Sequence, residues 1–400
     1  MNKLGKMQVA VFALVSASFT NIYLTQPVLP VLQREFCVSP VQVSLTVSFV
    51  ILGIVFSNLF FGYLSDRHPI HPILMVGGFF VAAGGVICSL THDFNLLVGA
   101  RLLQGLFIPA LTTSLAAWLA RTLPVERLSV VMGSYVSATI LGGLGGRLLG
   151  GWIHPPLHWR YAFISAAALI IVTTVLAVLM LPSTEKEAVA AARSTNGKET
   201  YLSLLKKKEL LLIYVCGAGS LLIFSPVFNY LPYRLSHPPF NLPTELITLV
   251  YLVYILGIFL GPMAGKLSSR FGGGIMLICS SLLLGASLLL LLLPSMTAVI
   301  VGLLGVCAGF FSLHTVAVVL LNRKLTCSHG KANALYVLFY YTGGWLGITG
   351  AGFAYEYADW RGVITFLLSF LIIPFSIGCF EKKAEANRRI TEAELPSPPA

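Results

Sequence analysis

Long apolar blocks divide this chain and restrict what it can fold into. A helix needs about 20 apolar residues to cross the hydrocarbon layer of a membrane, and twelve blocks meet that length. Because 56% of the residues are apolar and only 10% are charged, a water-soluble core is excluded. The predicted spans are residues 7–30, 41–63, 73–90, 94–120, 128–153, 159–181, 210–231, 246–264, 274–293, 297–321, 332–354 and 363–380. We therefore expect an all-α integral membrane protein with twelve transmembrane helices.

The two halves of the chain echo one another. The segment GYLSDR at 62–67 returns 203 residues later as GKLSSR at 265–270, and Trp159 and Trp360 stand 201 residues apart in the related triplets HWR and DWR. Repeats at this spacing indicate a duplicated membrane unit, here two six-helix repeats. The sequence thus predicts an N-terminal six-helix bundle over 1–181, a cytoplasmic linker over 182–208, a C-terminal six-helix bundle over 209–380 and a disordered cytoplasmic tail over 381–400.

Lysine and arginine are concentrated on one side of the predicted membrane. With both termini placed inside, the cytoplasmic segments hold 20 of the 26 Lys and Arg residues, as expected if positive loops stay in the cytoplasm. The net charge of +11 is thus a signal of topology, and no basic patch remains for a nucleic-acid partner. We expect both termini to be cytoplasmic, and residues 7–30 to be retained as the first helix rather than cleaved as a signal peptide.

Cysteine and histidine give no sign of a metal, a cofactor or an enzyme. The seven cysteines are scattered, with no CxxC pair and no histidines at ligand spacing. An integral membrane enzyme would need a cluster of histidines and carboxylates at the membrane face, yet His68 and His71 have only Asp66 nearby. We therefore expect no metal site, no cofactor and no catalytic residues. A membrane transferase is the alternative from another class.

The loop between the second and third predicted spans carries a recognisable motif. Gly62, Leu64, Asp66 and Arg67 fit the pattern G-x-L-x-D-R, and in this the loop resembles the major facilitator superfamily. Pro69 stands where that family usually has a glycine. The match is therefore half of the family motif, in the expected place.

Two further segments extend the resemblance. ARLLQG at 100–105 is similar to the R-x-x-Q-G of the fourth helix in many proton-coupled members. GGLGGRLLGG at 142–151 resembles the G-x-x-x-G-P-x-x-G-G element of the twelve-span drug:proton antiporters, with Arg147 in place of the proline. With the HWR triplet that follows, this version is similar to a bacterial subgroup described as inner-membrane efflux or arabinose-efflux-like permeases. The resemblance implies two bundles that rock about a central cavity.

The resemblance also implies a gate at the cytoplasmic end. Asp66 is placed to meet the positive N-terminal end of the eleventh helix, near Ser328, and to leave it when the cavity opens inward. In the second repeat Ser269 replaces the aspartate, so we expect an asymmetric gate. The alternative is a solvated loop pair of little energetic worth. The gate residues of the two loops are Gly62, Asp66, Arg67, Gly265 and Arg270.

Small residues recur every four positions in three of the spans. Such residues share one face of a helix and let a neighbouring backbone approach closely. They are Gly142, Gly146 and Gly150 in the fifth span, Gly257 and Gly261 in the eighth, and Gly343 and Gly347 in the eleventh. Because both repeats carry them at matched positions, we expect a seam between the bundles; the alternative is static packing.

Two arginines fall inside the predicted spans, where a charge is costly unless it is hydrated or paired. Arg101 and Arg147 have similar depths on adjacent helices, and Gln104 lies one turn from Arg101 on the same face. These three are candidates for a substrate or proton pathway, and the patch of Arg101 and Gln104 would suit an anionic or hydroxylated solute. The alternative, which we favour for Arg147, is that each arginine bonds backbone carbonyls at broken or glycine-rich helix segments.

Few other candidates for a proton or solute contact lie within the spans. No Asp or Glu falls inside one, which argues against a strongly cationic substrate. His314, whose ordinary pKa of about 6.5 suits proton exchange, is a candidate for coupling, although a lone intramembrane histidine more often bonds a neighbouring helix. Asn21 and Gln26 in the first span are candidate solute contacts.

These observations favour a secondary active transporter of the bacterial inner membrane. We expect proton-coupled efflux of a small neutral or anionic organic solute, with the lipid bilayer and protons as the other partners and the chain acting as a monomer. A solute:proton symporter or a uniporter of the same fold is the alternative, because the element that suggests export is incomplete at Arg147.

Overall fold

The computed structural model describes residues 3–182, 200–325 and 328–394. These residues form α-helices and two short 3-10 helices, with no β-strand, which confirms the all-α prediction. The first half contains α1 (Lys3–Tyr23), η1 (Gln26–Val28), α2 (Leu29–Phe36), α3 (Pro40–Ser65), α4 (Ile70–Leu90), α5 (Phe94–Leu111), α6 (Thr113–Thr122), α7 (Val125–Ile153) and α8 (Arg160–Met180). The second half contains α10 (Tyr201–Lys206), α11 (Lys208–Ser236), α12 (Thr244–Val250), η2 (Tyr251–Ile255), α13 (Leu256–Phe271), α14 (Gly273–Leu290), α15 (Met296–Arg323), α16 (His329–Phe370) and α17 (Ile372–Glu394).

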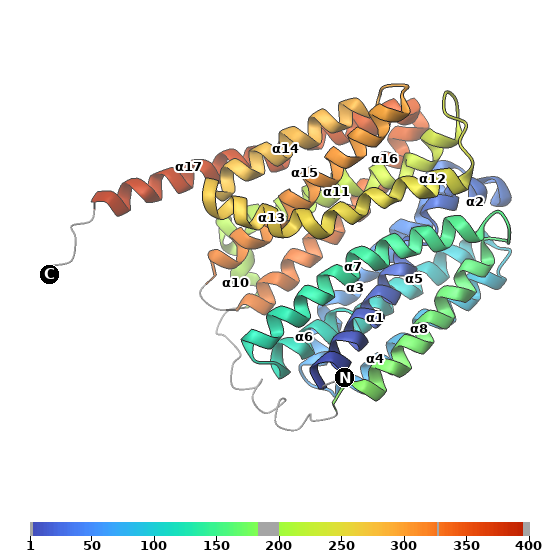
Figure 1. The fold of residues 1–400 in the computed structure, drawn as a ribbon, viewed down its shortest axis with the longest axis horizontal. Helices are drawn as coiled ribbons and strands as arrows, with labels where there is room; N and C mark the ends of the chain where they lie inside the picture. The colour runs from blue at the N-terminus through green and yellow to red at the C-terminus, as the bar shows by residue number, and fades with distance from the viewer. Residues whose placement is uncertain (1–2, 183–199, 326–327, 395–400) are drawn as a thin grey trace.

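The halves form two groups of helices that lie side by side (Figure 1). In the first half, drawn blue to green, α1 packs on α7 and α8, and α3 packs on α5. In the second, drawn yellow to red, α11 packs on α16, and α14 packs on α15 and α17. Contacts of α3 with α16 and of α7 with α12 join the groups.

The molecule has two ends, which we name from their residues. The motif end is where α3, α6, α13 and α15 finish, and it carries Asp66, Arg121, Ser269 and Arg323. The far end is where α3 and α12 begin and α7 finishes. Figure 1 shows α2 and α12 together at the far end, and α6 and α10 at the motif end.

Ten helical segments among the described residues are long and apolar enough to cross a membrane. The predicted twelve spans are therefore not reproduced one for one. Helix α7 is not among the ten, and α16 with most of α17 is one continuous segment, His329–Asn387. Within that segment the backbone leaves helical geometry at Ala358 and Asp359, where φ of Asp359 is 49°. The predicted eleventh and twelfth spans meet at this kink.

The first predicted span is broken near the far end. Helix α1 stops at Tyr23, and the chain continues through η1 into α2. Proline has no N–H to donate to a carbonyl four residues earlier, so Pro27 and Pro30 cannot continue the hydrogen bonding of α1. The break leaves backbone carbonyls of the last turn of α1 free for other donors.

The end of the chain differs from the expected disordered tail. Helix α17 runs on to Glu394. The Glu381 carboxylate, fully buried, accepts from Lys324 Nζ at 2.7 Å. Glu385 accepts from the backbone N–H groups of Gly273 and Gly274 at the start of α14, at 2.8 and 3.3 Å. The prediction is thus wrong for 381–394, because these carboxylates bind the helix to its own half; most of the predicted linker lies outside the described residues.

The glycine pattern brings helices together within each half. A methyl group at Gly142 or Gly146 of α7 would overlap a carbonyl oxygen of α1, and one at Gly150 would overlap that of Leu24, just after α1. Gly343 and Gly347 of α16 approach the backbone of α11 in the same way. In the eighth span, methyl groups at Gly257 and Gly261 would meet side chains of α15. These glycines therefore face partners in their own half, although α7 and α16 also contact the other half. The seam between the bundles stays a prediction.

Candidate functional site

Arg147 lies at the centre of the molecule, where the two halves meet. Its Nε donates to Gln26 Oε1 at 2.8 Å, and its Nη1 donates to the carbonyl of Gly143 at 2.7 Å. Its Nη2 donates across to the Tyr254 hydroxyl at 2.8 Å. The guanidinium carbon also lies 4.1 Å from the ring centres of both Tyr23 and Tyr254. Arg147 therefore contacts side chains of both halves.

A cavity of about 80 Å³ lies beside Arg147. Both halves line it, and no carboxylate is among its lining residues. The first half contributes Phe19, Tyr23, Thr139, Ile140, Gly143 and Arg147, and the second contributes Leu221, Phe224, Ser225, Tyr254, Phe310, Phe311 and Tyr340. The cavity is thus apolar and aromatic, with a single cationic group.

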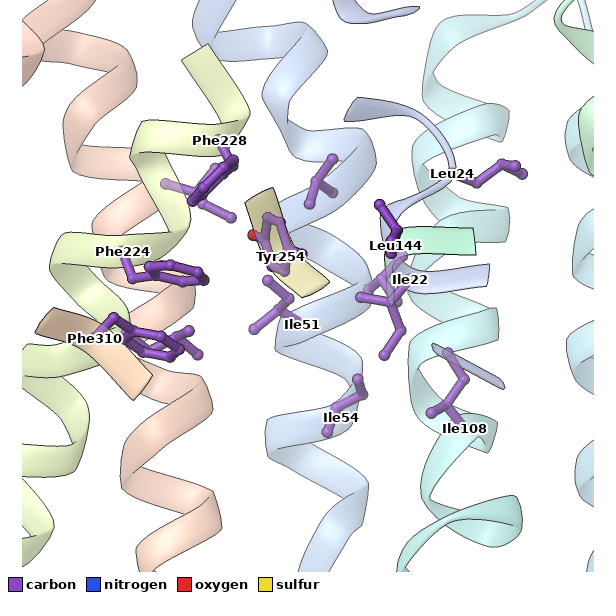
Figure 2. Packing of buried hydrophobic residues seen from close by; sticks show 14 of the residues in the cluster. Ile22, Leu24, Ile51, Ile54, Ile108, Leu144, Phe224, Phe228, Tyr254 and Phe310 are labelled. Atoms are coloured by element: carbon purple, nitrogen blue, oxygen red, sulfur yellow. The ribbon is translucent and has the colours of Figure 1, made fainter. Parts of the chain in front are cut away.

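Aromatic rings of the second half form one wall. Phe224 and Phe310 are stacked with ring centres 3.7 Å apart, and Tyr254 lies 5.5 Å from Phe224 and 4.5 Å from Phe228. Figure 2 shows these rings gathered together, with the aliphatic side chains of Ile22, Ile51 and Leu144 from the first half nearby. Tyr254 belongs to η2, so the break in the eighth span places its hydroxyl beside Arg147.

Arg101 is also buried, but it is held by the protein itself. Its Nε donates to the carbonyl of Thr46 at 2.7 Å. Its Nη1 donates to the carbonyl of Asn21 at 2.7 Å and to Gln104 Oε1 at 2.6 Å, and its Nη2 donates to the carbonyl of Ile22 at 2.8 Å. These carbonyls include those of the last turn of α1, beside the proline break. Arg101 thus stabilises the broken helix, and it is not among the residues that line the cavity.

The polar neighbours of Arg101 form a closed network. Gln104 Nε2 donates to the carbonyl of Val81 at 3.1 Å and to Asn21 Oδ1 at 3.3 Å. Asn21 Nδ2 donates to the carbonyl of Ala17 at 2.9 Å. Of the pathway candidates, Arg147 therefore lines the cavity and Gln26 bonds Arg147. Arg101, Gln104 and Asn21 are engaged elsewhere. Their roles in transport stay predictions.

His314 lies near the aromatic wall. Its ring is 6.0 Å from that of Phe310 and 4.7 Å from that of Tyr340, both of which line the cavity. Its Nδ1 is 3.0 Å from the Tyr336 hydroxyl. His314 is thus both a hydrogen-bonding partner of α16 and a titratable group one side chain away from the cavity.

At the motif end each half carries a similar pair of side chains. In the first half Asp66 forms an ion pair with Arg121, with 3.1 Å between Oδ1 and Nη1. In the second half Arg323 donates to Ser269 Oγ at 2.8 Å. Asp66 therefore bonds its own half, not the eleventh helix as predicted, and the latch stays a prediction.

The other predicted gate residues contact side chains of their own half. Arg67 lies over the ring of Tyr63, and Arg270 lies near that of Phe271. A methyl group at Gly62 would lie 3.9 Å from Thr113, and one at Gly265 would lie 4.0 Å from Thr315, each within the same half. Burial and the neighbouring Asp66 carboxylate raise the pKa of Tyr201, which begins α10.

At the far end the halves touch. The backbone N–H of Val41 donates to Glu356 Oε1 at 3.3 Å. A methyl group at Gly352 would lie 2.9 Å from Val41 Cγ2, and one at Gly151 would overlap the side chain of Thr248. Gly151 and Gly352 stand 201 residues apart, so the repeat spacing could have identified them.

Sequence reasoning also missed Tyr254, although YLVY at 251–254 is an unusual aromatic cluster within a span. Among the described residues, no group of histidine, cysteine, aspartate and glutamate side chains is arranged to hold a metal ion. The features that stand out are one buried cation, aromatic rings and a cavity shared by two repeated halves. A helical membrane transporter with two related bundles has this arrangement.

The chain belongs to the Major Facilitator Superfamily, whose family model matches residues 11–323. It is 27% identical to an uncharacterized transporter of Buchnera aphidicola from Schizaphis graminum, over 95% of this chain and 92% of that protein. It is 26% identical to the inner membrane transport protein YnfM of Escherichia coli, over 93% and 89%. A bacterial homolog of the human lysosomal transporter Spinster has the same fold, with a TM-score of 0.77 at 13% identity over 95% and 96%. The resemblance predicted from the motifs is confirmed.

Proposed function

We propose that this transporter moves a small neutral or anionic organic solute across the inner membrane by alternating access, in proton-coupled efflux. The observation that carries the proposal is the hydrogen bond from Arg147 in the first half to Tyr254 in the second, beside a cavity lined by both halves. A solute in this cavity contacts both bundles at once. Its binding can therefore favour one arrangement of the bundles over another.

The charge of the cavity supports the substrate class. Arg147 is a cation, and no carboxylate lines the cavity to offset it. A cationic solute would be repelled by Arg147 at short range, where the surroundings screen charge poorly. Neutral and anionic solutes avoid this cost.

The contacts at the two ends support alternating access. Val41, Glu356 and Gly352 bring the halves together at the far end, while Asp66 at the motif end bonds Arg121 of its own half. We take the motif end as cytoplasmic, with both chain termini on that side, because lysine and arginine are concentrated there. This arrangement is then the one closed to the outside, in which the Asp66 latch is released.

His314 is the proposed proton carrier. Its imidazole can bind and release a proton, and it is packed against Phe310 and Tyr340, which line the cavity. Solute bound against these rings would change the surroundings of the imidazole, and thus its affinity for a proton. A uniporter or a symporter of the same fold is the alternative that the test must separate.

The test is solute movement in proteoliposomes with and without an imposed pH gradient. The probes are 2-naphthoate, 2-naphthol and 2-naphthylmethylammonium, which share one ring system and differ in charge, and protein-free liposomes give the passive flux. We expect the gradient to drive the anion or the neutral compound above that background, and His314→Gln to abolish the dependence on the gradient. His68→Gln, in an exposed loop, is the matched control. If the solute moved above background but its movement did not depend on the pH gradient, proton coupling would be wrong and the protein would be a uniporter.

A further inference from the structure

We infer that the cavity binds an organic carboxylate with a planar aromatic body, held by Arg147, Gln26 and Tyr254. The inference rests on the proposed function and narrows its substrate class. It follows from a count of hydrogen-bond donors and acceptors at the cavity, and from the kind of side chains that surround them.

Arg147 has donors to spare. A guanidinium carries five N–H groups, and the hydrogen bonds to Gln26, Gly143 and Tyr254 use one each on Nε, Nη1 and Nη2. One N–H therefore remains on each terminal nitrogen, and two such groups can donate to the oxygens of a carboxylate. No ion pair to Arg147 occurs among the described residues, although the side chain is only 2% exposed.

The two side chains bonded to Arg147 also offer donors. Gln26 uses its Oε1 to accept from Arg147, and its Nε2, on the same amide, is buried with no hydrogen-bond partner. Tyr254 uses its oxygen to accept from Arg147, which leaves its O–H hydrogen available for an acceptor. The arginine has thus taken the acceptor atoms of both neighbours. What remains is a cluster of donors, which is chemically a site for an anion.

The walls of the cavity specify the rest of the ligand. Phe19, Phe311 and Tyr340 line it, together with the stacked pair Phe224 and Phe310. Aromatic faces favour a flat ring in offset or edge contact. Ser225 and Thr139 are the hydroxyl-bearing aliphatic residues of the lining, so most of the ligand surface meets apolar atoms. A small carboxylate without an apolar body would leave this wall unused.

The same contacts connect binding with movement. Arg147 and Gln26 belong to the first half and Tyr254 belongs to the second. A carboxylate bound between them adds hydrogen bonds across the two halves, and it neutralises a buried charge at the same time. The loaded and the empty transporter therefore differ in how strongly the two halves are joined at the cavity.

The experiment is equilibrium binding of 2-naphthoate, 2-naphthol and acetate to the purified full-length protein in detergent, by calorimetry at pH 7. We expect 2-naphthoate to bind at least tenfold more tightly than 2-naphthol, and acetate not to compete with it. Arg147→Met should remove the preference for the carboxylate, and Arg147→Lys should retain only part of it. Gln26→Leu and Tyr254→Phe should each weaken 2-naphthoate several-fold without changing the affinity for 2-naphthol.

Tyr251→Phe is the matched control. The Tyr251 ring also faces Arg147, at 5.4 Å, but its hydroxyl donates to the carbonyl of Phe228, so this variant should bind 2-naphthoate as the wild type does. Equal affinity for the naphthoate and the naphthol, or a preference that survives in Arg147→Met, would overturn the anion site. If Arg147→Met does not fold, unchanged binding in both Gln26→Leu and Tyr254→Phe overturns it instead. If acetate competed fully with 2-naphthoate, the inference that the ligand has a planar aromatic body would be wrong.

This outcome is separable from that of the proposed function. Movement of 2-naphthol driven by a pH gradient, with no binding of 2-naphthoate, would support proton-coupled transport and show that the substrate is not a carboxylate. Tight binding of 2-naphthoate without movement in proteoliposomes would support the site and count against its role in transport.

Discussion

The first half of the molecule breaks its leading helix, whereas the second half keeps the corresponding helix whole. In the first half, α1 ends at Tyr23 and two arginines, Arg101 and Arg147, lie beside the break. In the second half, α11 continues through Pro226 and Pro232 to Ser236. The repeat position of Arg147 is Ile348, whose carbonyl accepts from Tyr230. The half with the broken leading helix thus has buried arginines beside the break. The half with the continuous leading helix has an uncharged residue at the position that matches Arg147.

The halves differ in a second way, in where they bury charge. The first half buries Arg101 and Arg147 in the interior. The second half buries its charge at the motif end, where Lys324 meets Glu381 at 2.7 Å and Glu209 at 3.0 Å. A duplicated fold therefore does not imply duplicated chemistry. The first half supplies a cation to the cavity, and the second half supplies most of the aromatic rings.

Arg101→Met should have the largest effect on stability. The substitution removes four hydrogen bonds and leaves the buried carbonyls of Thr46, Asn21 and Ile22 without this donor. We expect a loss of about 4 to 5 kcal/mol in the free energy of unfolding, measured by denaturation in mixed micelles. Arg67→Met, at an arginine that lies over the Tyr63 ring, should cost less than about 1 kcal/mol. Equal losses would show that Arg101 does not stabilise the broken helix.

Glu381→Ala should come next, because it removes the buried partner of Lys324. The Glu381 side chain is fully buried, whereas that of Glu209, the other carboxylate bonded to Lys324, is 62% exposed. We expect a loss of about 3 kcal/mol for Glu381→Ala and below about 1 kcal/mol for Glu209→Ala. The same denaturation measurement applies. A small effect of Glu381→Ala would mean that α17 contributes little to the second half.

Gly146→Ala and Gly347→Ala test whether the halves use the same helix packing. Each added methyl group would overlap a backbone carbonyl, of Thr20 or of Leu222. We expect losses of about 1 to 3 kcal/mol that agree between the halves. Gly133→Ala, in open space on α7, should instead be neutral or stabilising by up to about 1 kcal/mol. If only one of the two variants lost stability, the two halves would not share the same helix packing.

Substitutions of the paired side chains at the motif end should have the smallest effect on the free energy of unfolding. Asp66 is largely exposed, so its ion pair with Arg121 is weak and screened. We expect a coupling of at most about 1 kcal/mol between Asp66→Ser and Arg121→Met in a double-mutant cycle, falling as salt is raised. The matching cycle of Ser269→Ala and Arg323→Met should show no salt dependence, because serine carries no charge. If the coupling in the second cycle depended on salt, the predicted difference between a charged pair in the first half and an uncharged serine contact in the second would be wrong.

The helices and the family were predictable, because they depend on local patterns. Apolar runs near 20 residues give helices wherever they occur, and GYLSDR and ARLLQG are contiguous motifs. The tail was misjudged because its composition resembles a solvated segment, while two of its carboxylates have partners far away in the chain. The partners of the glycines were not predictable, because a four-residue period fixes a helix face but not the helix that packs against it.

The sequence by itself determined that this chain is a duplicated helical membrane protein and placed Arg147 inside a membrane span, because hydrophobicity and repeat spacing are read along the chain. It did not determine which residues share the cavity. Arg147 and Tyr254 are 107 positions apart, in segments from different repeats. Only the tertiary structure decided that they meet, because their contact depends on the placement of Tyr254 in η2 and on how the two bundles pack against each other.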